Sequence, residues 1–476
     1  MKNSLRAFHD KLQKNIKDKP AWWYFIFAAA LLVLWMPYYL SFYPGIIRND
    51  EIVCFKQIFG EYPYSNHHPV VFTMFLRLVY TVVNGFGGSM NAVVAAATFG
   101  QMLFFAAVLS GLFLFLWKRS NCIWLNYCAI LFFMISPVIA KFAITLGKDT
   151  FFSGWFLLYI LVLYCIHKEN LLKKGWIFCI CFVALSVMTA ISRSNGLYIV
   201  ILMCILLSVI WRSQGYRLWI CNASVLVLVL LIKGPVFDYF QVSEPSVAEA
   251  FTVPLQQIGY ALSMDGDFRQ EDKEYLNRIL PIEDWKASYT PEISDSLKFH
   301  ENFNGFYLND TASEFLKVWA RGLIPNFSYY VKAYLEQIRG YWDIMQISDM
   351  GSWEVCENEY GIVQRDLWQE GLGFSIRRIC ILGVQAMRKL PVFNILTNEP
   401  CLILFWLGSF FYLVKKRQGG IAVTVLAGLL LWGTLLLAAP ASLQFRYLLS
   451  LHLLLPYVFF LLTMKNRARI KTETDS

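Results

Sequence analysis

Long apolar stretches separated by short polar segments dominate the pattern of residues along this chain. About 17 consecutive apolar residues form a helix long enough to cross the roughly 30 Å hydrocarbon layer of a membrane. Stretches of about that length or longer occupy residues 22–43, 91–117, 122–145, 150–166, 175–192, 196–211, 217–234, 398–414, 420–438 and 447–464. The sequence therefore predicts an all-α polytopic membrane protein with about ten transmembrane helices.

One further apolar stretch, residues 69–87, is ambiguous, and the basic residues decide its interpretation. If it does not span, the basic N-terminus lies on the same side as these later clusters: Lys118/Arg119, Lys168/Lys173/Lys174, Arg212/Arg217, Lys415/Lys416/Arg417 and Lys465/Arg467/Arg469/Lys471. That arrangement agrees with the excess of Lys and Arg in short cytoplasmic loops. Spanning would also place Arg77 near the bilayer centre, at a cost of about 2.5–3.5 kcal/mol. We therefore expect an interfacial helix on the outer face, opened by Pro69.

This topology divides the chain into three parts. Residues 1–234 form an N-terminal transmembrane module with about seven spans, and residues 398–476 form a C-terminal module with about three. Between them, residues 235–397 are polar, with helix-like stretches around 313–338 and a basic amphipathic helix from Phe374 to Leu390. We expect this segment to be one large, mainly helical extracytoplasmic domain, with both termini of the chain in the cytoplasm.

Composition and charge favour a membrane protein and exclude one class of function. Hydrophobic residues make up 57% of the chain and charged residues only 16%, against roughly 25% charged residues in soluble proteins. The net charge of +9 lies in short clusters between apolar stretches, which argues against nucleic-acid binding. No signal-peptide cleavage site follows the first apolar stretch, so we expect it to remain as the first helix of a multi-pass protein of the cell (plasma) membrane.

Acidic residues lie at the predicted outer boundary of the membrane. Asp50 and Glu51 follow the first predicted span, and Lys148-Asp149 lies in the short turn before the fourth. A carboxylate at such a place suits a general base or a metal ligand, while a solvated loop acid or a surface ion pair is the alternative. No Cys-x-x-Cys or Cys/His pattern assigns a metal-binding residue, and a divalent cation stays open.

Two arginines at the same boundary depart from the rule that short-loop cations lie inside. Arg193 begins the tight turn Arg193-Ser194-Asn195-Gly196, and Arg446-Tyr447 begins the last span. A planar guanidinium donates two parallel hydrogen bonds to a phosphate, whereas the alternative is a side chain that reaches the lipid headgroups. His67-His68-Pro69 opens the interfacial helix, where the imidazoles either bind phosphate, a metal or an acceptor hydroxyl or simply start the helix.

Taken together, these residues describe one site at the outer leaflet. It has carboxylates to activate a hydroxyl, arginines to hold a phosphate, and helices able to shelter a lipid tail. That chemistry fits the transfer of a sugar from a polyprenyl phosphate to an extracytoplasmic acceptor.

Several short motifs resemble those of the GT-C membrane glycosyltransferases. Tyr43-Pro44-Gly45…Asp50, followed by Tyr64-Ser65-Asn66-His67-His68-Pro69, is similar to their first outer loop. The similarity is to a bacterial branch containing DUF6020-type proteins and, more distantly, to protein O-mannosyltransferases and aminoarabinose transferases. Asp149 matches a second acidic residue after the third span. Further elements that resemble this group are Arg193 with Asn195-Gly196, Arg446-Tyr447, Pro254-Leu255-Gln256-Gln257 and Gly340-Tyr341-Trp342.

The resemblance implies a GT-C-like fold and inverting transfer from a polyprenyl-phosphate-linked sugar. On this basis we expect Asp50 to act as general base, assisted by Asp149 or Glu51. The expected donor-phosphate ligands are Arg193, Arg446 and Lys148, and the expected substrate-binding residues are His67, His68, Asn195 and Tyr447. The sequence has no clear Asp-x-Asp motif and no second Asp-Glu pair after the third span. These departures leave the sugar and the need for a divalent cation open.

Two other functions remain compatible with the sequence. A transporter or flippase of lipid-linked or anionic substrates would also need outer arginines, but it would place ionisable groups deep inside several spans. Lys141 and Lys233 are the few candidates for such groups. A non-catalytic assembly or receptor protein would have no reason to bring Asp50, Asp149, Arg193 and Arg446 together.

Overall fold

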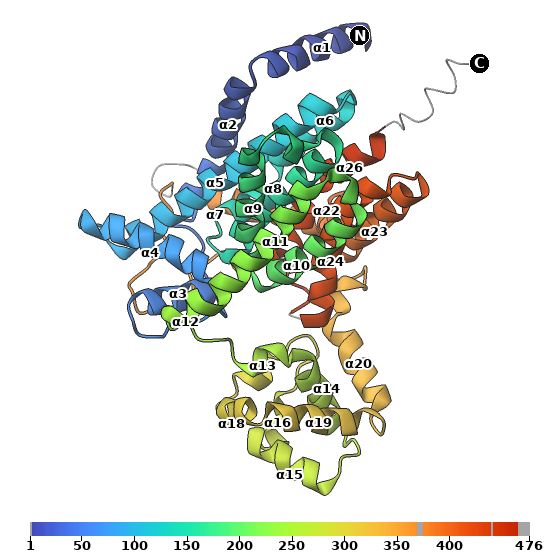
Figure 1. The fold of residues 1–476 in the computed structure, drawn as a ribbon. Helices are drawn as coiled ribbons and strands as arrows, with labels where there is room; N and C mark the ends of the chain where they lie inside the picture. The colour runs from blue at the N-terminus through green and yellow to red at the C-terminus, as the bar shows by residue number, and fades with distance from the viewer. Residues whose placement is uncertain (1, 369–374, 439–440, 465–476) are drawn as a thin grey trace.

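The computed structural model describes residues 2–368, 375–438 and 441–464 (Figure 1). Within these ranges the chain forms helices and four isolated β-bridges, with no extended strand. The last basic cluster of the sequence, from Lys465 to Lys471, lies outside the described residues, as does Phe374. The prediction of an all-helical protein is therefore confirmed for the described part of the chain.

Each of the ten apolar stretches is helical. They form α2 (Pro20–Ser41), α5 (Met90–Arg119), α6 (Ile123–Ile135) with α7 (Pro137–Ile144), α8 (Lys148–Glu169), α9 (Trp176–Ile191), α10 (Ser194–Ile210), α11 (Tyr216–Leu231), α23 (Glu399–Lys415), α24 (Gly419–Ala438), and the succession η5 (Phe445–Leu448), α25 (Leu449–Leu453) and α26 (Leu455–Thr463). A π-helical turn, η3 (Ile232–Val236), and α12 (Phe237–Tyr239) continue α11.

Six of these helical stretches in the described residues are long and apolar enough to cross a membrane. The pair α6 and α7 would be a seventh, bent by 49°. The bend falls where Pro137 begins α7, because proline cannot continue a helix from the preceding turn. Since α9, α10 and α23 have only 16 or 17 residues, length and composition support a multi-pass membrane protein without fixing ten spans.

The helices pack into one bundle with a shared apolar core. α2 packs on α5, α5 on α8, and α9 on both α8 and α10. Large apolar side chains are nevertheless exposed on the outward faces, among them Ile177, Ile180, Val209, Leu230 and Phe411. Exposed apolar surface on this scale is unusual for a soluble protein and suits contact with lipid.

The ambiguous stretch forms a single amphipathic helix, α4 (Val70–Gly85), which follows Pro69 as expected. Its inner face buries Phe72, Thr73 and Leu76, whereas Leu78 and Val82 are exposed. The helix projects from the side of the bundle in Figure 1. An exposed apolar face on such a helix suits the membrane interface.

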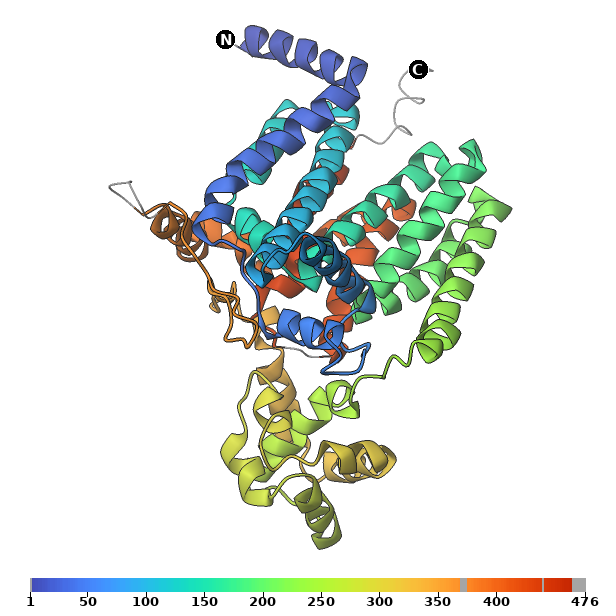
Figure 2. The ribbon, with the colours of Figure 1, turned by 90° about the vertical axis from the view of Figure 1, so that its left-hand side faces the viewer.

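A separate helical body follows α12. It comprises α13 (Val247–Ala250), α14 (Thr252–Ser263), α15 (Gln270–Ile279), α16 (Ile282–Ser288), α17 (Asp295–Lys298), α18 (Gly305–Asp310), α19 (Ala312–Leu323) and α20 (Phe327–Gln337). The body has its own core, which includes Leu255, Trp285 and Phe315. Figure 1 places it at one end of the bundle, with α1 (Lys2–Asp18) and the end of α26 at the opposite end. A sharp bend at Lys19 separates α1 from α2 (Figure 2).

The remainder of the large polar segment does not belong to that body. After η4 (Arg339–Tyr341), residues 342–368 run back along the bundle, and we call them the strap. The amide of Cys356 donates to the Ile47 carbonyl at 3.1 Å, and Lys141 Nζ donates to the Met350 carbonyl at 2.7 Å. Helices α21 (Ile376–Lys389) and α22 (Pro391–Thr397) then lead into α23. The described part of the segment 235–397 is thus not one domain: it contains a helical body, a strap that packs on the first loop, and two further helices, α21 and α22.

A tight turn at Gly45 sets the direction of the first loop. Its φ of +126° lies in a region that side chains other than glycine rarely adopt, and an added Cβ would lie 2.3 Å from Thr98 Oγ1. Directly after this turn, the amide of Ile46 donates to the Ile144 carbonyl at 3.0 Å. Gly45 therefore lets the chain approach α5. The helix α3 (Asn49–Ile58) follows this turn, and its start forms ion pairs with the first turn of α8.

Replacing Gly45 with alanine should destabilise the protein more than the same change at Gly60. Both glycines have positive φ, but an added Cβ at Gly60 meets nothing within 4 Å. Backbone strain of this kind costs about 1–3 kcal/mol, and only Gly45→Ala adds a clash to it. We expect a lower thermal unfolding midpoint for Gly45→Ala in detergent. Equal midpoints for the two variants would contradict this role of Gly45.

Candidate functional site

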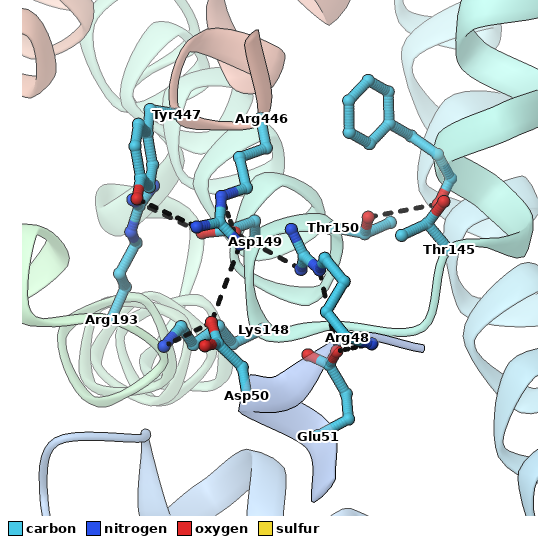
Figure 3. A network of polar contacts seen from close by, with 12 residues as sticks. Arg48, Asp50, Glu51, Thr145, Lys148, Asp149, Thr150, Arg193, Arg446 and Tyr447 are labelled. Atoms are coloured by element: carbon cyan, nitrogen blue, oxygen red, sulfur yellow. Dashed lines mark hydrogen bonds and ion pairs between the residues drawn. The ribbon is translucent and has the colours of Figure 1, made fainter. Parts of the chain in front are cut away.

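Ionisable side chains from four segments meet in one buried cluster (Figure 3). The first segment is the start of α3, which supplies Arg48, Asp50 and Glu51. The others are the first turn of α8, the turn before α10, and η5. The members of the cluster are Arg48, Asp50, Glu51, Lys148, Asp149, Arg193 and Arg446. The structure thus brings together the four boundary residues that the sequence singled out, Asp50, Asp149, Arg193 and Arg446.

Asp149 lies at the centre of this cluster. Its side chain is only 2% exposed, and three guanidinium groups surround it. Arg48 Nη2 and Arg446 Nε each lie 3.6 Å from Oδ2, and Arg193 Nη2 lies 3.4 Å from Oδ1. Because Asp149 also lies in the first turn of α8, the positive end of the helix dipole favours its carboxylate. Asp149 therefore holds three arginines around one point.

Asp50 lies at the more open edge of the cluster, with a side chain that is 28% exposed. Lys148 Nζ lies 3.1 Å and Arg446 Nη1 lies 3.7 Å from its Oδ2. Lys148 also contacts Nδ1 of the buried His68 at 2.9 Å. Of the three carboxylates, Asp50 is the one that a molecule approaching from outside would reach.

Glu51 is fully buried and holds the start of α3. Its Oε2 accepts a hydrogen bond from the Arg48 amide at 2.9 Å and lies 3.7 Å from Arg48 Nε. Gly147 allows this arrangement, since an added Cβ there would lie 2.6 Å from Arg48 Nη2 and 3.1 Å from Glu51 Oε1. Gln101 fixes the same turn, because its side chain accepts from the Gly147 amide and donates to the Thr145 carbonyl.

Tyr447 joins two arginines. The guanidinium of Arg193 lies 4.8 Å and that of Arg446 lies 4.9 Å from the centre of its ring. Arg446 Nη2 also donates to the Tyr447 hydroxyl at 3.0 Å. Stacking of this kind stabilises a cation and fixes its plane, so Tyr447 positions both arginines.

Two residues expected to bind substrate lie beside the cluster and not within it. His67 is exposed, and its ring centre lies 4.5 Å from that of His68. Asn195 points the other way, because its amide donates to Thr434 Oγ1 in α24 at 2.7 Å. The direction of Asn195 depends on α24, which is remote in sequence.

The electrostatics of the cluster favour an anion. Arg48, Lys148, Arg193 and Arg446 contribute four positive charges, and Asp50, Glu51 and Asp149 at most three negative ones, so the net charge is at least +1. Several buried donors also lack a hydrogen-bond partner, among them Arg48 Nε, Arg193 Nη1 and Arg446 Nε. Buried donors are almost always bonded in proteins, so these suit the oxygens of a phosphate.

Burial and charge shift the protonation of the outer members of the cluster. Burial by itself would raise the pKa of Asp50, but Lys148 and Arg446 outweigh it and hold that pKa well below its ordinary value. Burial lowers the pKa of His68 to about 3, aided by Lys148, so its ring is neutral near pH 7. Burial raises the pKa of Glu51 to about 7, although Arg48 opposes the shift.

Glu51 should make the stability of the protein fall between pH 6 and pH 8. A carboxyl with a raised pKa stabilises the fold while protonated, and this contribution is lost as the pH rises through the folded pKa of about 7. Across this interval the loss is about 1 kcal/mol. Glu51→Gln cannot ionise and should lose less. Thermal unfolding of both proteins at the two pH values measures the difference, and equal losses would contradict the raised pKa.

Sequence reasoning missed Arg48, Gln101 and Gly147. A signal for Arg48 was available, because it is a cation just beyond the first span, as unusual there as Arg193 and Arg446 are at their boundaries. Nothing local marks Gln101, which lies in an apolar helix, or Gly147, whose role depends on the approach of Arg48. Among the residues described by the structure, no group of three or more His, Cys, Asp or Glu side chains is arranged to hold a metal ion.

In the described residues the chain is helical and has several long apolar helices. These helices are consistent with a multi-pass membrane protein. The chain belongs to the family of unknown function DUF6020, whose model matches residues 62–476. That match covers the Lys148-Asp149, Arg193 and Arg446 segments but begins after Arg48, Asp50 and Glu51. No curated protein and no solved structure matches the chain.

Proposed function

We propose that this chain is a GT-C-type integral-membrane glycosyltransferase. It moves a sugar from a polyprenyl-phosphate donor to an extracytoplasmic acceptor with inversion. The observation that carries this proposal is the cationic cluster, in which three arginines surround Asp149 and two of its cations, Lys148 and Arg446, also contact the partly exposed carboxylate of Asp50. Such a cluster supplies both the phosphate ligands and the base that the reaction needs.

In this proposal the chain spans the cell membrane ten times, with α4 at the outer interface and both termini in the cytoplasm. The shorter helices α9, α10 and α23 are about 24–26 Å long at 1.5 Å per residue, enough for a locally thinned bilayer. The helical body and the cluster then share the outer face, where a polyprenyl-linked sugar is presented.

This topology is testable with single cysteines in a variant that lacks the native ones. Glu301→Cys in the body should react with a membrane-impermeant maleimide in intact cells. Lys174→Cys, between α8 and α9, should react only after the cells are permeabilised. The two positions lie on opposite sides only if an odd number of spans separates them. Labelling of both from outside would contradict the proposed topology.

The proposed chemistry assigns one role to each part of the cluster. The acceptor oxygen forms a bond to the anomeric carbon while the bond from that carbon to the phosphate oxygen breaks. The acceptor proton passes to Asp50, and polyprenyl phosphate leaves. Arg193 and Arg446 neutralise the charge that grows on the leaving phosphate. Glu51 and Asp149 are buried behind the arginines, so they position the cluster and do not touch the substrate.

Binding of the donor would also activate the base. In the resting cluster, Lys148 and Arg446 hold the pKa of Asp50 low, and a carboxylate with a low pKa is a weak base. A bound phosphate shares these two cations and so weakens their effect on Asp50. The pKa of Asp50 then rises toward its ordinary value of about 3.9, and the base becomes stronger only when donor is present.

The direct test uses proteoliposomes that contain the purified protein. They receive polyprenyl phosphates carrying labelled sugars, with an extract of the cell envelope as acceptor. The proposal predicts that label leaves the lipid and that polyprenyl phosphate appears in equal amount. Intact labelled lipid in every reaction would contradict it.

A lipid-linked or anionic-substrate transporter or flippase is the second candidate, and one observation favours it. Glu399 and His452 are fully buried in the C-terminal helices, where a transporter would use ionisable groups. The buried Lys141 does not count, because it donates to the strap carbonyls. In the same proteoliposomes a transporter would move labelled lipid between leaflets without cleaving it.

A further inference from the structure

Two of the buried polar groups outside the cluster, the carboxyl of Glu399 and the hydroxyl of Tyr341, stand out for their position and their hydrogen bonding. Glu399, in the first turn of α23, is 0% exposed, and neither of its carboxyl oxygens accepts a hydrogen bond. Tyr341, in η4, is 4% exposed, and its hydroxyl is likewise unbonded. A buried polar group left unpaired costs about 1–3 kcal/mol, and more if it is charged. Such a group in a native protein calls for an explanation, and a bound polar ligand supplies one.

Tyr341 connects Glu399 to the cluster. η4, which carries Tyr341, packs against α23, which carries Glu399, and it also contacts Ser442 just before η5. Arg193 Nη1 is itself a buried donor without a partner. Burial raises the pKa of Tyr341 well above its ordinary value, so its hydroxyl stays neutral and can donate a hydrogen bond. Tyr341 therefore lies between the segment that carries Arg446 and Tyr447 and the helix that carries Glu399.

The backbone holds Tyr341 in this position. An added Cβ at Gly340 would lie 2.2 Å from the Ser442 carbonyl oxygen, and the Gly340 amide donates to Ser442 Oγ at 3.0 Å. Ser442 precedes η5, which carries Arg446 and Tyr447. Figure 1 shows α20 running from the body to the bundle, and η4 follows it directly. The same contacts thus fix Tyr341 relative to the proposed phosphate ligands.

Glu399 is fixed in a similar way. Asn398, at the N-cap of α23, donates to the carbonyls of Ile344 and Gln346, each at 3.1 Å. Ser348 is the one hydroxyl close to the Glu399 carboxyl, and its Oγ donates to the Thr397 carbonyl at 3.1 Å, so the single Ser348 proton is shared between the two acceptors. The described residues place no Lys or Arg in ion-pair contact with Glu399. Its oxygens are therefore acceptors for hydroxyl groups and not partners of a cation.

We propose that Tyr341 and Glu399 form the sugar-binding part of the site and read hydroxyl groups of the sugar that the arginines hold by its phosphate. This inference rests on the proposed glycosyl transfer. A sugar ring carries several hydroxyls, each able to donate to Glu399 or to accept from Tyr341. A site built to bond a hydroxyl rejects a sugar that lacks it, because its buried groups are then left unpaired. Tyr341 and Glu399 are accordingly specificity-determining residues.

The test compares two classes of lipid on the detergent-solubilised full chain. The probes are bare polyprenyl phosphate and polyprenyl phosphates linked to glucose, mannose, galactose or arabinose. We expect at least one sugar-linked lipid to bind wild type more tightly than the bare lipid. Tyr341→Phe and Glu399→Gln should each reduce this advantage about tenfold, as expected for one lost hydrogen bond to a buried or charged group. Their affinity for bare polyprenyl phosphate should not change.

Matched controls are Tyr334→Phe, whose hydroxyl bonds the Leu436 carbonyl, and Glu354→Gln, an exposed strap residue. Both should keep the preference for the sugar-linked lipid. An unchanged preference in Tyr341→Phe and Glu399→Gln would overturn the sugar-binding role. So would an equal loss for both lipids with a lower unfolding midpoint, which indicates a structural role. Failure of wild type to bind any polyprenyl phosphate would instead overturn the proposed function itself.

Discussion

Replacing Asp50 with asparagine should reduce sugar transfer by about 10²–10⁴-fold, the usual contribution of a positioned general base. The amide keeps the size of the side chain but cannot take the acceptor proton. Asp50 is partly exposed and is paired only with Lys148 and Arg446, so its loss leaves Asp149 and the three arginines in contact. The measurement is release of labelled sugar from polyprenyl phosphate in proteoliposomes, with unfolding midpoints as a check on the fold.

The matched control is Asp310→Asn, an exposed carboxylate of α18 in the helical body. It should transfer sugar at the wild-type rate. Binding of bare polyprenyl phosphate should persist in Asp50→Asn, because the arginines remain. Transfer by Asp50→Asn within about threefold of wild type, well short of a lost base, would remove Asp50 from the chemistry.

Replacing Arg446 with lysine should reduce transfer about 10²–10³-fold, with the larger effect on use of the donor. Lysine keeps the charge but loses the planar fork. The fork lies 3.6 Å from Asp149 and 3.7 Å from Asp50, and it bonds the Tyr447 hydroxyl at 3.0 Å. A single ammonium cannot hold all three partners and a phosphate. Initial rates at varied donor and varied acceptor concentration separate the two effects.

Arg339→Lys supplies the control for charge and side-chain type. Arg339 lies in η4, and its Nε is 3.0 Å from Asp343 Oδ2. It is not a member of the cluster. We expect the initial rate of Arg339→Lys to vary with donor concentration as the rate of wild type does. If Arg446→Lys changes acceptor use as much as donor use, its role as a phosphate ligand is wrong.

The helices were the most predictable feature, for a simple physical reason. A chain in hydrocarbon must satisfy its backbone hydrogen bonds internally, so a long apolar stretch has few alternatives to a helix. The bend at Pro137 and the position of Pro69 before α4 also follow from proline chemistry. The division of residues 235–397 into a body and a strap could not be predicted, because it depends on distant contacts such as Cys356 with Ile47.

Only those residues of the site that the predicted membrane topology marks as unusual could be predicted from the sequence. Counting cations on the outer face identified Arg193 and Arg446, and the structure places both against Asp149. The sequence did not show which of the two aspartates is exposed. Asp149 and Asp50 are the same residue type at similar predicted positions, yet Asp149 is buried and Asp50 is partly exposed. The sequence singled out Tyr341 only as part of the short motif Gly340-Tyr341-Trp342. Glu399 is a single acid in an apolar stretch, and its neighbours in sequence do not predict which distant residues it contacts.

We propose that this cluster transfers a sugar from a polyprenyl phosphate outside the cell membrane. The most direct test is quantitative analysis of cell-envelope glycans and lipid-linked sugars in cells that lack the protein. We predict loss of one glycan component and accumulation of one polyprenyl-phosphate sugar, both reversed by wild type but not by Asp50→Asn. Unchanged glycans and lipid pools in the deletion strain, or full reversal by Asp50→Asn, would contradict the claim.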